Sequence, residues 1–317
     1  MEYSLDNLKQ ILESWDLELL KIREDLVIAG SPERTDFRVV LETKDGGLFL
    51  VENFSDKLVE VKEKIINVLE FLENKELGKI NNYIKNQDGK YIIEDQGKFW
   101  QLQKFITGTK LDRINYIFEE WRGEVLAEWL INFKNKSKDI KVKNQEVFSL
   151  KDYVYQIYTD VQNHNPEIIP RLKPIIDFLE SNLMDNYNQL PIAFCHGDYH
   201  PVNVIWSKDN IQAVIDWEFC GLKPEIYDIA NMVSCVGMEN PECLQRGLII
   251  GFIKKIKSTK LIQDISWKYL IDAMIAIRFA WLAEWLRKDI PEMIELELIY
   301  MHLLKDNYQD LNKIWFT

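Results

Sequence analysis

A short run of polar residues in this chain has the types that phosphate chemistry requires. His196, Asp198 and Asn203 fall within the segment HGDYHPVN, and Asp216 follows after two apolar runs separated by a turn. Asparagine and aspartate oxygens are ligands that Mg²⁺ accepts, and a further carboxylate can accept or orient the proton of a hydroxyl group. If these groups converge, Asn203 and Asp216 would bind the metal and Asp198 would act as the base. Phosphoryl transfer needs this set of groups.

Three motifs in this region resemble those of the aminoglycoside phosphotransferase and choline kinase superfamily. HGDYHPVN at 196–203 is similar to its catalytic loop, and IDWE at 215–218 is similar to its metal-binding segment. GLKPEIYDIA at 221–230 carries the glycine, proline and aspartate of a third motif, with Asp228 as the aspartate. The resemblance implies a protein-kinase-like fold, ATP and Mg²⁺ as co-substrates, and a small molecule's hydroxyl group as the acceptor.

Three residues near these motifs are interpreted as support for the catalytic loop. We expect His196 to be a buried histidine that holds the loop. His200 either orients Asp198 or is an ordinary loop histidine. Asp228 opens a predicted helix, where it either caps that helix or tethers the loop, and both roles keep it away from the substrate.

The resemblance extends more weakly into the first third of the chain. The stretch around Gly30 and Arg38 looks like a hairpin that covers the phosphates, although Gly30 is the only glycine in AGSPERT. WQLQKFITG, with Gln103 and Phe105, looks like a hinge that contacts adenine through its backbone. These four residues are the predicted nucleotide contacts.

One position departs from the family pattern. The family usually places a lysine or arginine at the end of the second hairpin strand, where it reaches the ATP phosphates and pairs with a glutamate on the next helix. Here that position holds Glu52, and an acid cannot neutralise phosphate oxygens. By analogy the helix residue would be Glu60 or Glu63, which would repel Glu52 unless a cation lies between them. Three basic residues are candidates for the missing cation: Arg38, Arg34 and Lys57.

The hydrophobic pattern predicts an α+β chain with two lobes. Residues 1–104 form the small lobe, an antiparallel sheet of about five strands, with a hinge at 101–108. Residues 109–317 form a larger, mostly helical lobe that contains the catalytic loop and the acceptor pocket. Strands are predicted at 26–29, 37–43, 48–53, 91–94 and 98–105, with a turn at 44–47.

Two helices are predicted in the small lobe. The first begins after Ser4, a residue type that caps helices. The second covers about 56–77, and one set of its apolar residues has the spacing of a buried face: Val61, Ile65, Val68, Leu69 and Leu72.

Composition excludes several classes of protein. The chain has 317 residues, of which 47% are apolar and 28% charged, as in ordinary globular proteins. Its net charge of -12 disfavours nucleic acid and anionic membrane surfaces as partners. The four cysteines form no CxxC pair, and the polar N-terminus and lack of a long apolar run favour a cytoplasmic protein. The sequence does not indicate an oligomeric state.

The sequence also bears on the acceptor. Only eleven residues separate Asp216 from Asp228, too few for the peptide-docking segment of a protein kinase, so a small acceptor is expected. By analogy Trp281, Glu284 and Trp285 would line the acceptor pocket. Alternatively, they belong to an ordinary amphipathic helix with one face in the core and the other in solvent. An amino alcohol, amino sugar, aminoglycoside or choline-like compound would suit such a pocket, and neutral sugars and homoserine stay open.

Two other functions are compatible with parts of the sequence. A catalytically silent kinase-like protein that binds a nucleotide or metabolite would explain Glu52, whereas the intact Asp198, Asn203 and Asp216 favour an enzyme. A hydrolase with paired acids is the weaker alternative, because the chain has no G-x-S-x-G nucleophile elbow.

Overall fold

The computed structural model describes residues 3–141 and 146–316, which form two compact units. The N-terminal unit contains residues 3–111, 139–141 and 202–218, and the C-terminal unit contains residues 112–138, 146–201 and 219–316. The segment 202–218 thus belongs with the N-terminal unit although it follows much of the C-terminal unit in sequence. The lobes expected at 1–104 and 109–317, with a hinge at 101–108, stay predictions.

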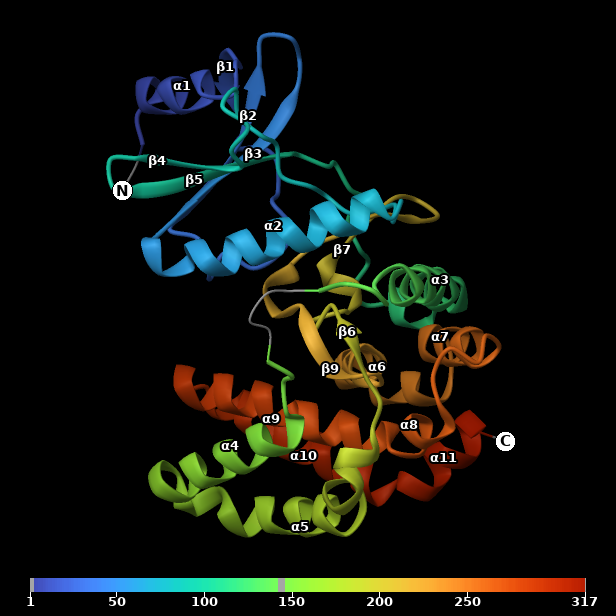
Figure 1. Ribbon diagram of the computed structural model, residues 1–317. Coiled ribbons are helices and arrows are strands. Elements are labelled where there is room, and N and C mark those ends of the chain that lie inside the picture. Colours follow the sequence, from blue (N-terminus) through green and yellow to red (C-terminus); the bar gives the residue numbers. More distant parts are fainter. Residues whose placement is uncertain (1–2, 142–145, 317) are drawn as a thin grey trace. The chain divides into compact units, whose positions relative to one another are not determined.

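Five antiparallel strands form the sheet of the N-terminal unit, in the order β1-β2-β3-β5-β4 (Figure 1). Their bounds are β1 (Leu19–Ile22), β2 (Phe37–Thr43), β3 (Leu48–Phe54), β4 (Ile92–Asp95) and β5 (Lys98–Lys104). The sheet and the β2–β3 hairpin confirm the predicted antiparallel sheet.

The strand predicted at 26–29 is wrong. The first strand is instead β1, in which Leu19 pairs with Thr43 of β2. The ladder ends where the Arg23 N–H donates to the Val40 carbonyl, and the chain then turns away from β2. Residues 26–29 lie outside the sheet because β1 already occupies the free edge of β2.

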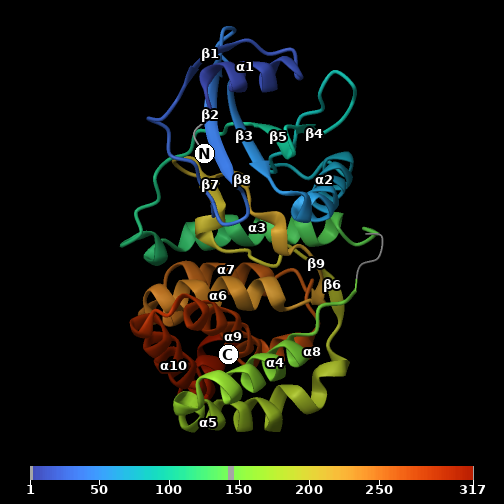
Figure 2. The same cartoon turned by 90° about the vertical axis from the view of Figure 1, so that its left-hand side faces the viewer.

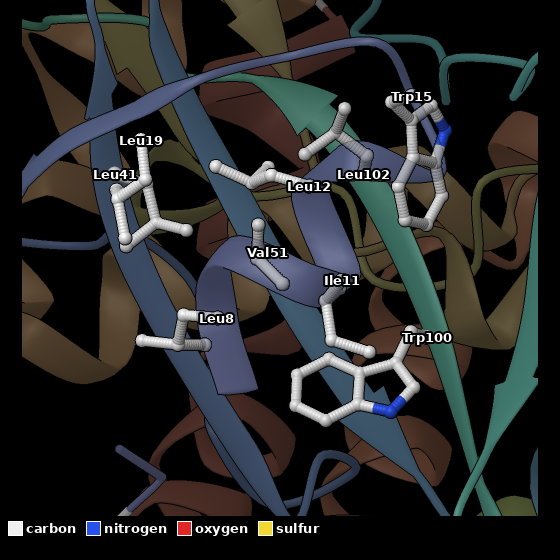
Figure 3. Packing of buried hydrophobic residues seen from close by; sticks show 9 residues of the cluster. All are labelled: Leu8, Ile11, Leu12, Trp15, Leu19, Leu41, Val51, Trp100 and Leu102. Carbon is white, nitrogen blue, oxygen red and sulfur yellow. The ribbon is translucent and has the colours of Figure 1, made fainter. Parts of the chain in front are cut away.

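One helix, α1 (Leu5–Glu13), covers one face of this sheet. It begins as predicted at Ser4, whose hydroxyl accepts the Asn7 N–H while the Asn7 side chain accepts the Ser4 N–H. This reciprocal pair satisfies two backbone donors that a helix start leaves free. Figure 3 shows the buried core between helix and sheet: Leu8, Ile11, Leu12, Trp15, Leu19, Leu41, Val51, Trp100 and Leu102.

The second helix, α2 (Val59–Asn74), follows a short 3-10 turn at Asp56–Leu58. Its buried apolar residues include four of the five predicted ones: Ile65, Val68, Leu69 and Leu72. Val61 is 36% exposed, and Lys62 is buried in its place. Glu60 and Glu63 are exposed, so neither takes the inward position that analogy gave them.

The C-terminal unit is largely helical, as predicted. Figure 2 shows α3 beside α7 and α9 beside α10. The helices are α3 (Glu120–Lys136), α4 (Leu150–His164), α5 (Ile169–Leu179), α6 (Tyr227–Glu239), α7 (Leu248–Lys257), α8 (Asp264–Lys268), α9 (Leu270–Lys288), α10 (Pro291–Asp306) and α11 (Tyr308–Phe316). Within the described residues, no helix has the length and apolar character needed to cross a membrane.

Two short ladders carry the motifs found in the sequence. β6 (Ile192–Cys195) pairs with β9 (Gly221–Pro224) in the C-terminal unit, and β7 (Val204–Trp206) pairs with β8 (Ile211–Val214) in the N-terminal unit. Short helical turns complete the fold: Tyr116–Phe118, Pro166–Ile168, Glu180–Met184, Tyr187–Gln189, Pro201–Asn203, Trp217–Phe219 and Pro241–Gln245.

Candidate active site

The two candidate metal ligands lie at the open end of the β7–β8 hairpin. Val204 pairs with Val214, and one residue further out the Ile215 N–H donates to the Asn203 carbonyl at 3.0 Å. This bond holds Asn203 beside the residue that precedes Asp216. Asp216 has a φ of 65°, a left-handed conformation that costs energy for a residue with a side chain and that clusters at functional sites.

The loop that carries Gly30 lies against Asp216. The Ser31 N–H donates to Asp216 Oδ2 at 3.0 Å. Gly30 has a φ of 80°, and a Cβ on it would lie 3.0 Å from the same oxygen, so the loop needs glycine there. The Arg38 guanidinium donates to the carbonyls of Ile28, Gly30 and Ser31 at 3.3, 2.8 and 3.2 Å. The structure therefore brings Gly30, Arg38 and Asp216 together, with Arg38 bound to the loop backbone.

A buried lysine of α2 pairs with the last residue of the IDWE motif. Lys62 Nζ lies 3.0 Å from Glu218 Oε1, and the Lys62 side chain is 2% exposed. Burial alone would raise the pKa of Glu218, but the Lys62 ammonium holds that pKa below its usual range. Sequence reasoning missed Lys62 because its partner is 156 positions away.

Glu52 lies on β3, opposite Arg38 of β2 and Gln101 of β5. Its carboxylate accepts a hydrogen bond of 2.9 Å from Gln101 Nε2. Burial raises the pKa of Tyr83 well above its usual value, and the charges of Glu52 and Glu218 raise it further. These two carboxylates thus act on one phenol group.

The two residues of the predicted hinge lie at the end of β5 in the N-terminal unit, Gln103 inside the strand and Phe105 just after it. Gln103 pairs with Leu50, and its side-chain amide donates to the Asn81 carbonyl at 3.0 Å. The Phe105 N–H donates to the Leu48 carbonyl at 2.9 Å. Their contact with adenine stays a prediction.

In the C-terminal unit, Asp228 tethers the loop that follows β6. The N–H groups of His196 and Gly197 donate to its two carboxylate oxygens at 3.0 and 2.8 Å. Lys134 Nζ lies 3.7 Å from Asp228, and both side chains are buried. Gly197 has a φ of 85°, and a Cβ on it would lie 2.2 Å from the Phe219 carbonyl oxygen, so glycine is required. Asp228 thus has the tethering geometry, and Lys134 was missed by sequence reasoning.

The predicted base, Asp198, is held at the end of this tethered loop. Its N–H donates to His196 Nδ1 at 3.3 Å, and the His196 side chain is fully buried. Asp198 Oδ1 lies 3.5 Å from His200 Nε2 and 3.4 Å from Asn231 Nδ2. His200 is therefore close enough to orient Asp198. Asn231 was not predicted, although it directly follows the third motif.

The three residues predicted for the acceptor pocket lie on α9. The rings of Trp281 and Trp285 are stacked with centroids 6.0 Å apart, and all three side chains are half-buried. Hydrogen bonding to Arg287 lowers the pKa of Glu284 to about 2, and Lys288 lies 2.9 Å from the same carboxylate. The charge of Glu284 is thus already balanced by cations of its own helix. The acceptor role of this group stays a prediction.

The donor set at the β7–β8 hairpin fits magnesium. Within residues 3–141 and 146–316, no three His, Cys, Asp or Glu side chains are placed to hold a metal ion together. Asn203 and Asp216 offer one amide and one carboxylate. Mg²⁺ in nucleotide sites is usually bound through one or two protein oxygens, with water and phosphate oxygens completing the shell.

Residues 31–254, most of the chain, match the profile of the phosphotransferase enzyme family, and the chain belongs to this family. A search of curated proteins finds no match.

Solved structures of similar fold include small-molecule kinases. An amicoumacin kinase in complex with AMP-PNP and Ca²⁺ is 12% identical, with a TM-score of 0.71 over 96% of this chain and 94% of that one. The GDP complex of aminoglycoside 2'-phosphotransferase-IIIa is 16% identical (TM-score 0.68, 97% and 100% covered). A microcompartment-associated aminopropanol kinase is 12% identical (TM-score 0.68, 97% and 98% covered). These likenesses confirm the predicted α+β protein-kinase-like fold.

Proposed function

We propose that the protein is an ATP- and Mg²⁺-dependent phosphotransferase that acts on a hydroxyl group of a small molecule. The observation that carries the proposal is the geometry at the β7–β8 hairpin, where Asn203 and Asp216 lie at one end beside the Gly30 loop. Membership of the phosphotransferase family supports it. The relatives are bound to AMP-PNP and GDP, so both ATP and GTP are candidate donors.

Each residue has a separate task in the proposed reaction. Asp198 accepts or orients the proton of the acceptor hydroxyl, and Asp228 keeps its loop in place. Asn203 and Asp216 hold Mg²⁺, which when bound offsets negative charge on the transferred phosphoryl group. Most of the rate enhancement then comes from positioning and electrostatics.

The acceptor is proposed to be an amino alcohol, an amino sugar or an aminoglycoside. A net charge of -12 favours the approach of cationic molecules. Among the structural relatives, one is named an aminopropanol kinase and others are solved with kanamycin or spectinomycin. The alternative is a catalytically silent nucleotide-binding protein, which Glu52 on β3 favours.

A direct experiment incubates the protein with ATP or GTP, Mg²⁺ and a panel of hydroxylated amines, and measures release of the nucleoside diphosphate. We expect acceptor-dependent turnover with at least one compound. Titration calorimetry with a non-hydrolysable ATP analogue, with and without Mg²⁺, separates the alternatives. Metal-dependent binding without turnover would favour the silent protein, and no binding at millimolar nucleotide would contradict both. Asp216→Ala should abolish the effect of the metal on binding.

A further inference from the structure

The N-terminal unit gathers negative charge where the proposed function requires phosphates to bind. Burial raises the pKa of the Tyr83 hydroxyl, and the charges of Glu52, Glu218 and Asp216 raise it further, so the three carboxylates lie near one group. A nucleoside triphosphate would add several more negative charges to this cluster. Mg²⁺ on Asp216 would offset part of this charge, and a side-chain cation near Glu52 and Glu218 would offset more of it.

The Arg38 guanidinium does not supply this cation in the structure. It is directed to the loop carbonyls of Ile28, Gly30 and Ser31, which it holds together. A guanidinium bound to three carbonyls would have to release the loop before it could contact a phosphate.

Lys62 is a buried cation inside the cluster, and the charge of Arg34 also lowers the pKa of Glu218. The Lys62 Nζ donates to Glu218, which follows the candidate metal ligand Asp216 by two residues. The same Nζ lies 5.7 Å from the centroid of the Phe54 ring at the end of β3. Burying an ammonium costs several kcal/mol, and a hydrophobic residue at this position of α2 would serve the core better. An ammonium has three donors, so it can bind Glu218 and still donate to a phosphate oxygen.

We propose that Lys62, carried by α2, contacts the phosphates of the bound nucleotide, and that Glu218 positions it. This inference rests on the proposed function and deepens it. Because Glu218 and Asp216 lie on one short turn of the chain, the lysine and the metal ligand would act on neighbouring oxygens of the same phosphate chain. The phosphate-binding cation would then lie on α2 and the acid Glu52 on β3, the reverse of the family pattern.

The test compares ligands that differ only in their phosphates. Dissociation constants for ATP and for adenosine are measured by calorimetry in the presence of Mg²⁺, for the wild type and Lys62→Met. We expect the variant to bind ATP at least tenfold more weakly and adenosine within twofold of the wild type. Lys75→Met is the matched control, because Lys75 ends the same helix with its side chain 44% exposed, and it should change neither constant.

Two further variants separate a phosphate contact from a structural ion pair. Lys62→Met/Glu218→Gln leaves no unpaired buried charge, so it should fold and still lose the preference for ATP over adenosine. Lys62→Arg should restore part of that preference. Equal loss of ATP and adenosine binding with a lower melting temperature would mean that Lys62 is only structural.

The two proposals fail in different ways. A wild type that binds no nucleotide would contradict the proposed function and this inference with it. A wild type that binds Mg·ATP, together with a Lys62→Met variant of unchanged ATP-to-adenosine preference, would overturn the role of Lys62 alone.

Discussion

Two loops of the molecule are held by charged side chains of opposite sign. In the C-terminal unit, the carboxylate of Asp228 accepts the backbone N–H groups of His196 and Gly197. In the N-terminal unit, the guanidinium of Arg38 donates to three backbone carbonyls around Gly30. Both arrangements use one ion to fix several backbone dipoles, but they differ in burial: Asp228 is fully buried, whereas Arg38 is partly exposed.

Burial decides how firmly each loop is held. A hydrogen bond to an ion is stronger in a low-dielectric interior than near water, and breaking it there leaves an unpaired charge. We therefore expect the loop at 196–198 to be rigid and the loop at 28–31 to open at little cost. This difference suits the proposed function, because a base must stay in position while a loop over phosphates must admit the nucleotide.

The largest effect, on turnover, is expected for Asp198 in the loop at 196–198. Asp198→Asn removes the proposed base and keeps its shape, so turnover should fall by about 10² to 10⁴-fold with nucleotide affinity nearly unchanged. Steady-state kinetics and calorimetry measure the two quantities. Asp209→Asn, at an exposed aspartate of the β7–β8 turn, is the control and should keep full turnover. Loss of nucleotide affinity without loss of turnover would contradict the assignment.

The next effect concerns the tether itself. Asp228→Asn removes the charge that two backbone N–H groups and Lys134 share, which leaves a buried ammonium without its carboxylate. Breaking such a pair costs about 3–5 kcal/mol of unfolding free energy, which urea denaturation measures. Asp228→Asn/Lys134→Met should recover part of this loss. An unchanged denaturation midpoint in the single variant would show that the loop does not depend on Asp228.

A second buried aspartate of the C-terminal unit, Asp272, shows how burial changes the pKa of a carboxylate whose oxygens have no hydrogen-bond partner among the described residues. Burial raises the pKa of Asp272, on α9, to about 7. Because this pKa lies above the unfolded value of about 4, the folded protein retains a proton that the unfolded chain has lost, and stability falls as pH rises from about 4 to 7. Asp272→Asn removes this loss, which is at most about 4 kcal/mol at 1.4 kcal/mol per pKa unit.

Thermal unfolding at two pH values checks this prediction. Asp272→Asn should melt higher than the wild type at pH 8 and close to it at pH 4. The exposed Asp209→Asn should follow the wild type at both. A variant that melts lower than the wild type at pH 8 would mean that the Asp272 carboxylate is stabilised as an ion.

Local patterns predicted much of the fold and part of the site. The hairpin of β2 and β3 and the start of α1 at Ser4 follow from turn and cap residues, which act over a few positions. The strand expected at 26–29 was wrong because a short apolar run carries no information on which segment reaches the edge of β2 first.

The site residues that sequence missed depend on distant partners. Lys62 contacts Glu218 and Lys134 contacts Asp228, and each pair joins separate elements of the chain. A lysine on a helix is usually solvated, so only the packing of α2 distinguishes Lys62 from its exposed neighbours. Motif spacing predicted Asp198, Asn203 and Asp216, because these residues lie in short turns whose geometry depends on neighbouring positions.

The smallest effect is expected for the weaker of the two loops, and it also tests the earlier expectation that Arg38 contacts a phosphate. Arg38→Met removes the donors that hold the Gly30 loop and should weaken ATP binding by about threefold to tenfold, near 1 kcal/mol, since these bonds are partly exposed. Arg38→Lys distinguishes the two roles. An ammonium can replace a guanidinium as a point charge on phosphate, but it cannot span three carbonyls in a fixed plane. If Arg38 holds the loop, Arg38→Lys should bind ATP as weakly as Arg38→Met, whereas wild-type affinity in Arg38→Lys would assign Arg38 to the phosphates.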